Sequence, residues 1–339
     1  MIGRFLLRRL RGSLLVLFGV SAITFVLARV VPSNPALAYL GAKATPEQAE
    51  QVRHTLGLDR PLPVQYAKYL GGVFRGDWGT SIGTKRPVLD EITGRLPSTL
   101  ELVGSAMAIA LVSGVVLGVA AAYRPGRLAD HAIRVTSIAG VSLPAFWLGL
   151  LLQLFAFGWL NVLPPTGETS SDLPYVSPIR HITGMNLLDS LLTANWTALS
   201  DVAAHLVLPA VTLAAYPMGA IARMTRATML ETLAQDHIRV ARAYGVPERT
   251  VRWRIALRNA LPPTATVVGL TAAYGLTGAF FVEVVFDRPG LGRYAASSLL
   301  SLDYPAIMGI TLLGAVAYVL VNLVVDLTQA RLDPRVRLT

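Results

Sequence analysis

The stretch LVGSAMAIALVSGVVLGVAAAY (102–123) carries no charged side chain. A helix of about 20 apolar residues is long enough to cross the hydrocarbon core of a bilayer. Within this stretch, Gly114 and Gly118 stand four positions apart, a spacing that lets a second helix approach closely. The stretch therefore predicts a transmembrane helix that packs against another helix.

Five other stretches are similarly long and almost free of charge. They cover about residues 13–31, 135–160, 202–222, 263–282 and 305–325. The whole chain is 53% hydrophobic and 15% charged, whereas an ordinary soluble domain is about 25% charged. Six such stretches predict an all-α polytopic membrane protein with six transmembrane helices. Prolines at 144, 209 and 217 are expected to bend the third and fourth of these helices.

The first apolar stretch has one alternative interpretation, a cleavable signal peptide. Arg4, Arg8, Arg9 and Arg11 precede it, and Ala36-Leu37-Ala38 resembles a cleavage site. Its apolar core is longer than the roughly 7–15 residues usual in a signal peptide. The length favours an uncleaved membrane anchor.

The distribution of basic residues predicts the orientation. If the N-terminus is cytoplasmic, the inner segments 1–12, 124–134, 223–258 and 331–337 carry 18 Lys and Arg residues, and the two short outer loops carry three. Cytoplasmic loops of membrane proteins are enriched in Lys and Arg. Both termini are therefore predicted to be cytoplasmic, in a multi-pass protein with net charge +10 and no cysteine.

The segment after the first stretch reads as a small ordered extracytoplasmic element. Thr45-Pro46-Glu47-Gln48 is typical of a helix start, and this helix can stop at Gly57. A second helix is expected in LDRPLPVQYAKYL (58–70), before a turn in GDWGTS (76–81). The apolar spacing in 186–200, at the end of the outer loop 161–201, indicates a helix along the outer membrane face. We predict three parts: 1–96, 97–330 and a cytoplasmic tail 331–339.

Motifs for catalysis and cofactor binding are missing or out of context. The chain has no G-x-x-x-x-G-K-[ST] loop for a nucleotide phosphate, and the five histidines have no metal-ligand spacing. PGLGRYA (289–295) contains G-x-G-x-x-A, but it lies in a short loop between two apolar stretches. Glu101, Glu283 and Asp326 lie near stretch ends, where they do not suggest a proton pathway. These observations predict a membrane protein without metal, cofactor or catalytic residues of its own.

The most basic stretch is QDHIRVARAYGVPERTVRWRIALRNALPP (235–263), with six arginines and two acids. With the residues just before it, MLETLAQDHIRVARAYG (229–245) predicts a helix that ends at Gly245, followed by a turn and a second helix over 248–260 that ends at Pro262-Pro263. Such a hairpin could bind nucleic acid, anionic lipid or a protein groove. Its attachment to the membrane at both ends disfavours nucleic acid, and lipid attraction explains part of the arginine content. The small Ala241 and the turn at Gly245 favour a protein groove.

Residues 97–337 closely resemble the membrane subunit of dipeptide/oligopeptide-type ABC importers, the first of their two permease chains. The resemblance rests on the blocks RLPSTLEL (95–102), HLVLPAVTL (205–213), RMTRATMLETLAQDHIRVARAYGV (223–246), ALRNALPP (256–263), VEVVFDRPGLGRY (282–294) and VNLVVDLTQARLDPRVR (321–337). LGLDRPLPVQY (56–66) and GDWGTS extend it toward the N-terminus. The resemblance implies the type I importer (MetI-like) fold in the cytoplasmic membrane of a bacterium.

The resemblance also implies that a coupling loop over about 223–262, the EAA loop, docks on an ATP-hydrolysing subunit. Arg239-Val240-Ala241 stands where the family pattern has Glu-Ala-Ala. The implied coupling residues are Arg239, Val240, Ala241, Arg242, Ala243, Tyr244 and Gly245. The implied partners are a second homologous permease, two ATP-binding subunits that hold ATP and Mg, and an extracytoplasmic solute-binding protein.

The short loop 283–294 is our candidate for an outer gate or a contact with the binding protein. Its candidate residues are Glu283, Asp287, Pro289, Gly290, Gly292 and Arg293. Within the family the expected substrate is a dipeptide or oligopeptide, with nickel, glutathione or another peptide-like solute as alternatives. An ion-driven secondary transporter is the more distant alternative.

Overall fold

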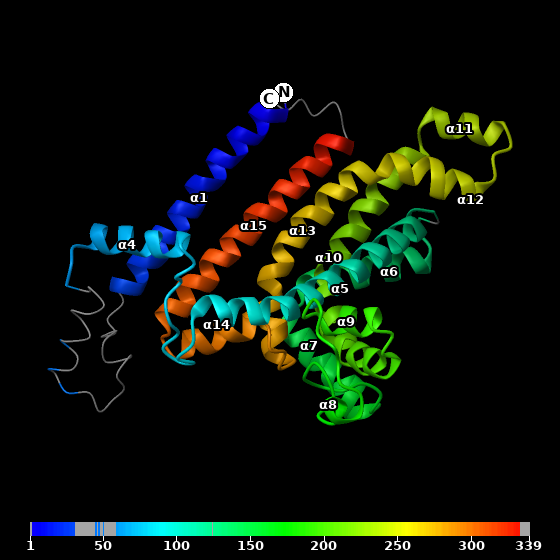
Figure 1. The fold of residues 1–339 in the computed structure, drawn as a ribbon. Helices are drawn as coiled ribbons and strands as arrows, with labels where there is room; N and C mark the ends of the chain where they lie inside the picture. Colours follow the sequence, from blue (N-terminus) through cyan, green and yellow to red (C-terminus); the bar gives the residue numbers. More distant parts are fainter. Residues whose placement is uncertain are drawn as a thin grey trace. The chain divides into compact units, whose positions relative to one another are not determined.

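The computed structural model describes residues 2–30, 45, 47, 50, 59–123 and 125–332 (Figure 1). Helices dominate these residues, which contain no β-sheet and only one isolated bridge, between Thr80 and Pro87. Among the described residues five helices are long and apolar enough to cross a membrane, or six if a pair of helices bent at a short break counts as one span. This confirms the predicted all-α polytopic fold.

The described helices begin and end as follows. They are α1 (Ile2–Val30), α4 (Leu62–Phe74), α5 (Val88–Tyr123), α6 (Leu128–Ser142), α7 (Ala145–Gln153), α8 (Leu173–Val176), α9 (Asn186–Leu192), α10 (Trp196–Leu233), α11 (Asp236–Ala243), α12 (Glu248–Thr250), α13 (Leu257–Val285), α14 (Leu291–Leu300) and α15 (Tyr304–Leu332). Two π-helical turns, Leu154–Trp159 and Val251–Ala256, continue α7 and precede α13. The predicted helix start at Thr45-Pro46-Glu47-Gln48 and the stop at Gly57 lie outside the described residues.

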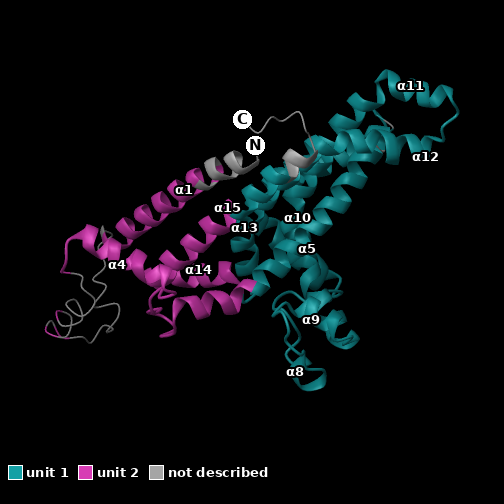
Figure 2. Ribbon diagram, turned by 45° about the horizontal axis from the view of Figure 1, so that its top comes forward, with its two compact units in different colours: residues 1–2, 97–289, 320–339 teal, residues 3–96, 290–319 magenta. Residues whose placement is uncertain are grey.

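The chain forms two compact units, coloured separately in Figure 2. Unit 1 comprises residues 1–2, 97–289 and 320–339, and unit 2 comprises residues 3–96 and 290–319. The three-part division predicted above concerns domains of the transporter and stays a prediction.

Helix α10 is the centre of unit 1 and packs against α6, α7, α9 and α13. Small residues make these contacts close, since a Cβ atom added to Gly219 would lie 2.5 Å from the Ser137 carbonyl oxygen of α6. Gly114 and Gly118 of α5 face the same helix, because added Cβ atoms would lie 2.8 Å and 2.6 Å from side-chain atoms of Ile221 and Thr225. The predicted packing role of these two glycines is confirmed.

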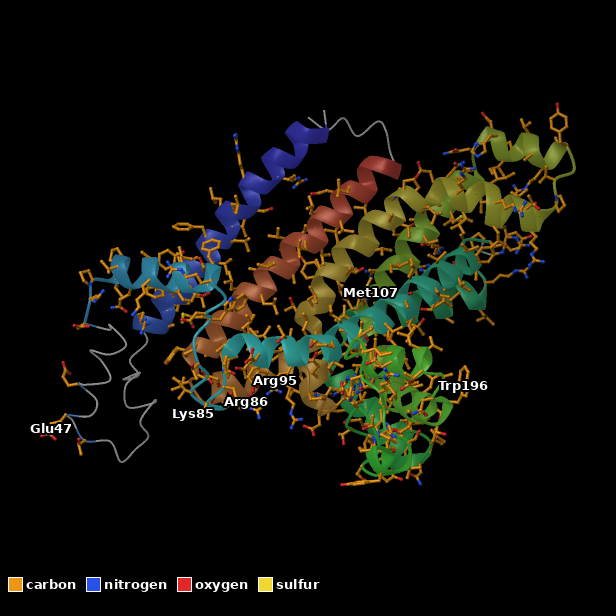
Figure 3. The ribbon with its side chains drawn as sticks, viewed as in Figure 1. Glu47, Lys85, Arg86, Arg95, Met107 and Trp196 are labelled. Carbon is orange, nitrogen blue, oxygen red and sulfur yellow. The ribbon has the colours of Figure 1, made fainter. Side chains whose placement is uncertain are left out.

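Two ends of unit 1 carry its non-spanning parts. Figures 1 and 2 place the α11–α12 hairpin at one end and α8 and α9 at the other. We call the segment that contains α8 and α9 the 161–195 connection. Trp196 follows it as the first residue of α10, and its side chain is exposed (Figure 3).

Pro144 interrupts the third predicted span. Helix α6 ends at Ser142, α7 begins at Ala145, and the two axes differ by 112°. The predicted bend at this proline is confirmed. Helix α10, in contrast, continues without a break through Pro209 and Pro217.

The predicted helix end at Pro262-Pro263 is wrong, because one helical stretch runs from Glu248 to Val285 through both prolines. Ala256 and Ala260 are fully buried against side chains of α5 and α10 just before the prolines. A proline inside a helix costs about 3 kcal/mol, but its φ angle suits a helix and membrane helices tolerate it when neighbours pack closely. Packing on this side therefore outweighs the local preference.

Unit 2 is held by an aromatic cluster and a buried aspartate. Tyr66 of α4 stacks edge-on against Phe18 of α1, and its hydroxyl lies 2.7 Å from that of Ser21. Asp303 accepts hydrogen bonds from the Ser81 hydroxyl and, at 3.0 Å, from the Gly83 N–H. The predicted GDWGTS turn is confirmed, with positive φ angles at its two glycines.

Candidate functional site

The basic hairpin begins with a break at Ala234 and Gln235, which separates α10 from α11 and which the sequence prediction missed. Helix α11 ends where predicted. Gly245 has φ +74°, and its N–H donates to the Arg242 carbonyl oxygen at 3.0 Å. Glycine suits this left-handed position because it has no Cβ atom. An added Cβ would contact nothing within 4 Å, so backbone conformation alone demands glycine here.

Ile238 packs α11 against neighbouring helical segments of the same chain. It is fully buried in a cluster with Met229, Val251 and Ala256. Ala241 lies one turn further along and is half-buried. The side of α11 that carries Ala241, which was expected to enter a protein groove, is therefore partly covered by this chain itself.

The accessible face of α11 is a different one. Val240 is 52% exposed and Tyr244 is 86% exposed, four positions apart on one side of the helix. The other candidate coupling residues that are exposed are Arg239, Arg242, Ala243 and Gly245. The spacing of Val240 and Tyr244 could have identified this face in the sequence.

Ion pairs and a cation–π contact brace the hairpin. The Arg242 Nε donates to Glu248 across the turn at 2.8 Å, and Arg239 contacts Asp236 at 3.1 Å. Both pairs are exposed, so each contributes little, about 0–1 kcal/mol. Arg252 lies over the Tyr123 ring, 3.2 Å from its centroid, and ties the second arm of the hairpin to the end of α5.

The candidate outer segment divides into buried and exposed residues. Glu283 is fully buried and accepts a hydrogen bond from the Thr99 hydroxyl at 2.6 Å. Gly290 and Gly292 are also buried. The exposed candidates are Asp287, Pro289 and Arg293.

The sequence prediction missed Arg288, which is fully buried between two of these exposed positions. Its Nη2 donates to Glu168 at 2.9 Å and to Glu101 at 3.3 Å. Its Nε and Nη1 have no hydrogen-bond partner among the described residues. In a sequence, Arg288 looks like any arginine of a polar loop.

Arg288 and its acids form the Arg288 cluster, which we define as Arg288, Glu101, Glu168, Ser98 and Asn186. Glu168 accepts from the Ser98 hydroxyl and, at 3.1 Å, from the Asn186 side chain. Glu101 accepts from the Leu187 N–H. The cluster joins the beginning of α5, the 161–195 connection and the residues after α13.

A second buried acid organises the 161–195 connection itself. Asp189 is fully buried and accepts from the N–H groups of Ile182, Thr183 and Gly184 at 2.8–3.0 Å. Burial disfavours its charged form, but the hydrogen bonds from Thr183 and the neighbouring N–H groups outweigh burial and lower the pKa of Asp189. The ionised Asp189 carboxylate thus holds the backbone of residues 182–184 in place.

A cavity of about 270 Å³ lies within the membrane-spanning part of unit 1. It is lined by the two sides of the α6–α7 break, by α10 and by α13. None of its lining residues is charged; its polar side chains are Thr212, Tyr216, Thr271 and Tyr274.

The chain was then compared with known proteins. Residues 114–338 match the family model "Binding-protein-dependent transport system inner membrane component", and residues 1–103 match the N-terminal model of the same kind of component. The chain belongs to this family.

Three relatives match almost from end to end. The chain is 44% identical to a probable D,D-dipeptide transport system permease of Escherichia coli, over 97% of this chain and 96% of the relative. It is 38% identical to a dipeptide transport system permease of Escherichia coli and 39% identical to a di/tripeptide transport system permease of Pseudomonas aeruginosa, over 98% of each chain.

As an inner membrane component of a binding-protein-dependent system, the chain is a multi-pass membrane subunit of an ABC importer that works with an ATPase and a binding protein. Its α11–α12 hairpin and its 161–195 connection stand at opposite ends of unit 1 (Figure 1). The hairpin residues predicted for coupling lie together on α11 and its terminal turn. The residues predicted for the outer gate divide into a buried set, Glu283, Gly290 and Gly292, and an exposed set, Asp287, Pro289 and Arg293.

Proposed function

We propose that this chain is one of two permease subunits of an ATP-driven importer that moves short peptides by alternating access. The observation that carries the proposal is the match over 96–98% of three permeases whose names specify di- or tripeptides. The other subunits would be a second homologous permease, two ATP-binding subunits that hold ATP and Mg, and an extracytoplasmic solute-binding protein. This chain would bind no cofactor.

Transport by the whole complex tests this proposal. The complex is reconstituted in liposomes with its binding protein, and uptake of radiolabelled L,L- and D,D-dipeptides is measured with ATP and with a non-hydrolysable analogue. We expect uptake of at least one class only with ATP. Uptake driven by an ion gradient without ATP would indicate a secondary transporter. Uptake of nickel or glutathione, but of no dipeptide, would show that the proposed substrate is wrong.

We further propose that the hairpin and both termini face the cytoplasm and that the 161–195 connection faces outward. Segments 1–12, 124–134, 223–258 and 331–337 carry 18 basic residues and the two short outer loops carry three, which supports this orientation. Because the chain has no cysteine, Tyr244→Cys and Tyr175→Cys each introduce its only thiol, at positions that are 86% and 90% exposed. An impermeant maleimide should label Tyr175→Cys in intact spheroplasts and Tyr244→Cys only after permeabilisation; the reverse pattern would invert the topology.

The exposed face of α11 is the proposed docking surface for the ATPase. Gly245 sets the direction of the hairpin turn at φ +74°, where a residue other than glycine costs about 1–2 kcal/mol and Asn is tolerated best. Gly245→Val should therefore uncouple ATP hydrolysis from transport, whereas Gly245→Asn should retain most coupling. Equal coupling in both variants would show that the turn geometry is not what the ATPase recognises.

The exposed residues Asp287, Pro289 and Arg293 are proposed to meet the binding protein or the second permease. A crosslinker on Arg293→Cys should capture one of these two partners. Failure to capture either in every nucleotide state would remove the segment from the contact surface. The buried residues Glu283, Gly290 and Gly292 would not touch a partner; they would shape the backbone of the segment 283–294.

A further inference from the structure

We infer that the cavity at the α6–α7 break is a water-filled section of the substrate path, which accepts an uncharged portion of a peptide, up to a limited side-chain size. The inference rests on the proposed peptide transport. It assigns the site to helices α6, α7, α10 and α13 of this chain.

The break in the helix leaves backbone groups beside the cavity that water in the cavity can serve. Between Ser142 and Ala145 the last carbonyl groups of α6 and the first N–H groups of α7 lack partners within a helix. At membrane depth such backbone is tolerated only where it is buried in protein or lines a water-filled space. Leu143 and Ala145 line the cavity from the two sides of the break. Water can therefore serve these groups, which argues against a lipid chain as the occupant.

The volume is sufficient for water and for part of a solute. One water needs about 10–15 Å³ of such space, so a cavity of about 270 Å³ holds many. A solute that enters replaces this water without moving a helix.

The lining determines which chemistry is held there. The hydroxyls of Thr212 and Thr271 already donate to carbonyl oxygens of their own helices, each at 2.8 Å. The Tyr216 and Tyr274 hydroxyls have no partner among the described residues, and the two side chains are 43% and 61% exposed. Two free hydroxyls can serve a peptide group or a polar side chain. With no charge in the lining, the terminal charges of a peptide are not trapped, as passage requires.

Glycines form the wall and set the size limit. A Cβ added to Gly140 would lie 2.8 Å from the Ala215 carbonyl oxygen, and one added to Gly278 would lie 3.0 Å from Leu213. At Gly275 the nearest atom, on Val103, would be 3.8 Å away, an ordinary contact. Of the three glycines that line the cavity, Gly275 is therefore the one at which an added side chain begins with an ordinary contact rather than a clash.

Narrowing the cavity in the reconstituted complex tests the inference. Uptake of Ala-Ala and of Ala-Trp is compared for Gly275→Ala, Gly275→Val and Gly275→Leu. We expect uptake of Ala-Trp to fall progressively, by about tenfold or more in Gly275→Leu, since one methylene in a filled pocket changes rates by about 10–200-fold. Uptake of Ala-Ala should fall much less. Gly104→Leu on α5 is the matched control, because a Cβ there meets nothing within 4 Å.

Thiol labelling tests the same inference without transport. Tyr216→Cys and Tyr274→Cys should react with a hydrophilic methanethiosulfonate reagent, and the dipeptide with ATP should slow the reaction. Leu270→Cys, exposed on α13 outside the cavity, should react slowly. Lack of labelling at both tyrosine positions in every nucleotide state would overturn the inference. It would also be overturned if Gly275→Leu took up Ala-Trp and Ala-Ala as fast as the wild type does. A wild-type complex that moves no peptide but shows this labelling would overturn only the proposed substrate.

Discussion

Replacement of Arg288 by methionine should release the 161–195 connection from the rest of unit 1. Methionine preserves most of the side-chain volume but removes the guanidinium from Glu101 and Glu168. All three side chains are at least 85% buried. The two acids would then share a closed space without a counter-charge, and opening of the connection to water would relieve them.

The magnitude follows from the distances. With an effective dielectric constant of about 20, contacts of 2.9 Å and 3.3 Å correspond to gross attractions of about 6 and 5 kcal/mol. Desolvation of the three charged groups offsets much of this. Removal of one partner from a buried pair typically costs about 3–5 kcal/mol. Since about 1.4 kcal/mol is tenfold in an equilibrium constant, opening of the connection should become at least about a hundredfold more frequent.

Hydrogen–deuterium exchange of the complex in nanodiscs measures this opening. Backbone amides of residues 177–195 should exchange about a hundredfold faster in Arg288→Met than in the wild type. Arg180→Met is the matched control, because Arg180 is an exposed arginine of the same connection. The double variant Arg288→Met/Glu168→Gln should regain part of the protection, since it removes one uncompensated charge. Unchanged exchange in Arg288→Met would refute the assigned role of the cluster.

Two further predictions concern the same unit. The pKa of Asp189 is lowered in the folded chain, so its ionised form stabilises the connection above its ordinary pKa of 3.8 and this stabilisation is lost as the pH falls below that value. Limited proteolysis of the connection should therefore accelerate below about pH 4 in the wild type, and Asp189→Asn, which weakens the bonds from Thr183, should be cleaved quickly at neutral pH; a flat pH profile would contradict the assignment. Gly269→Ala places a Cβ atom 2.3 Å from Val325, and such overpacking costs about 1–3 kcal/mol, so the melting temperature should fall. Gly104→Ala, in open space, should keep or raise it, and equal melting temperatures would show that α13 and α15 yield at this contact.

The membrane-spanning helices were predictable because the length and apolarity of a stretch are sufficient evidence for a span. The turn at Gly245 was predictable because it depends only on the backbone conformation of that residue and not on contacts with distant segments. The helix end predicted at Pro262-Pro263 was wrong, because the conformation there depends on more than the local sequence. Local preference was outweighed by contacts of Ala256 and Ala260 with segments distant in the sequence.

The Arg288 cluster could not be predicted from a single sequence. Arg288 and Arg293 stand five positions apart in the sequence, yet the first is buried and the second exposed. The difference arises from Glu168 and Glu101, which lie 120 and 187 positions away along the chain. The cavity has the same origin, since its lining comes together only when α6, α7, α10 and α13 pack.

The helix that runs through Pro262 and Pro263 has a mechanical consequence. From Glu248 to Val285 it is 38 residues long without a break, or about 57 Å at 1.5 Å per residue. A tilt of about 10° around one end of such a rod displaces the other end by about 10 Å, the width of one helix. Helix α6 cannot act in this way, because the 112° bend at Pro144 separates its movement from that of α7. Within unit 1, an uninterrupted helix from Glu248 to Val285 thus packs against one half of the broken pair α6 and α7.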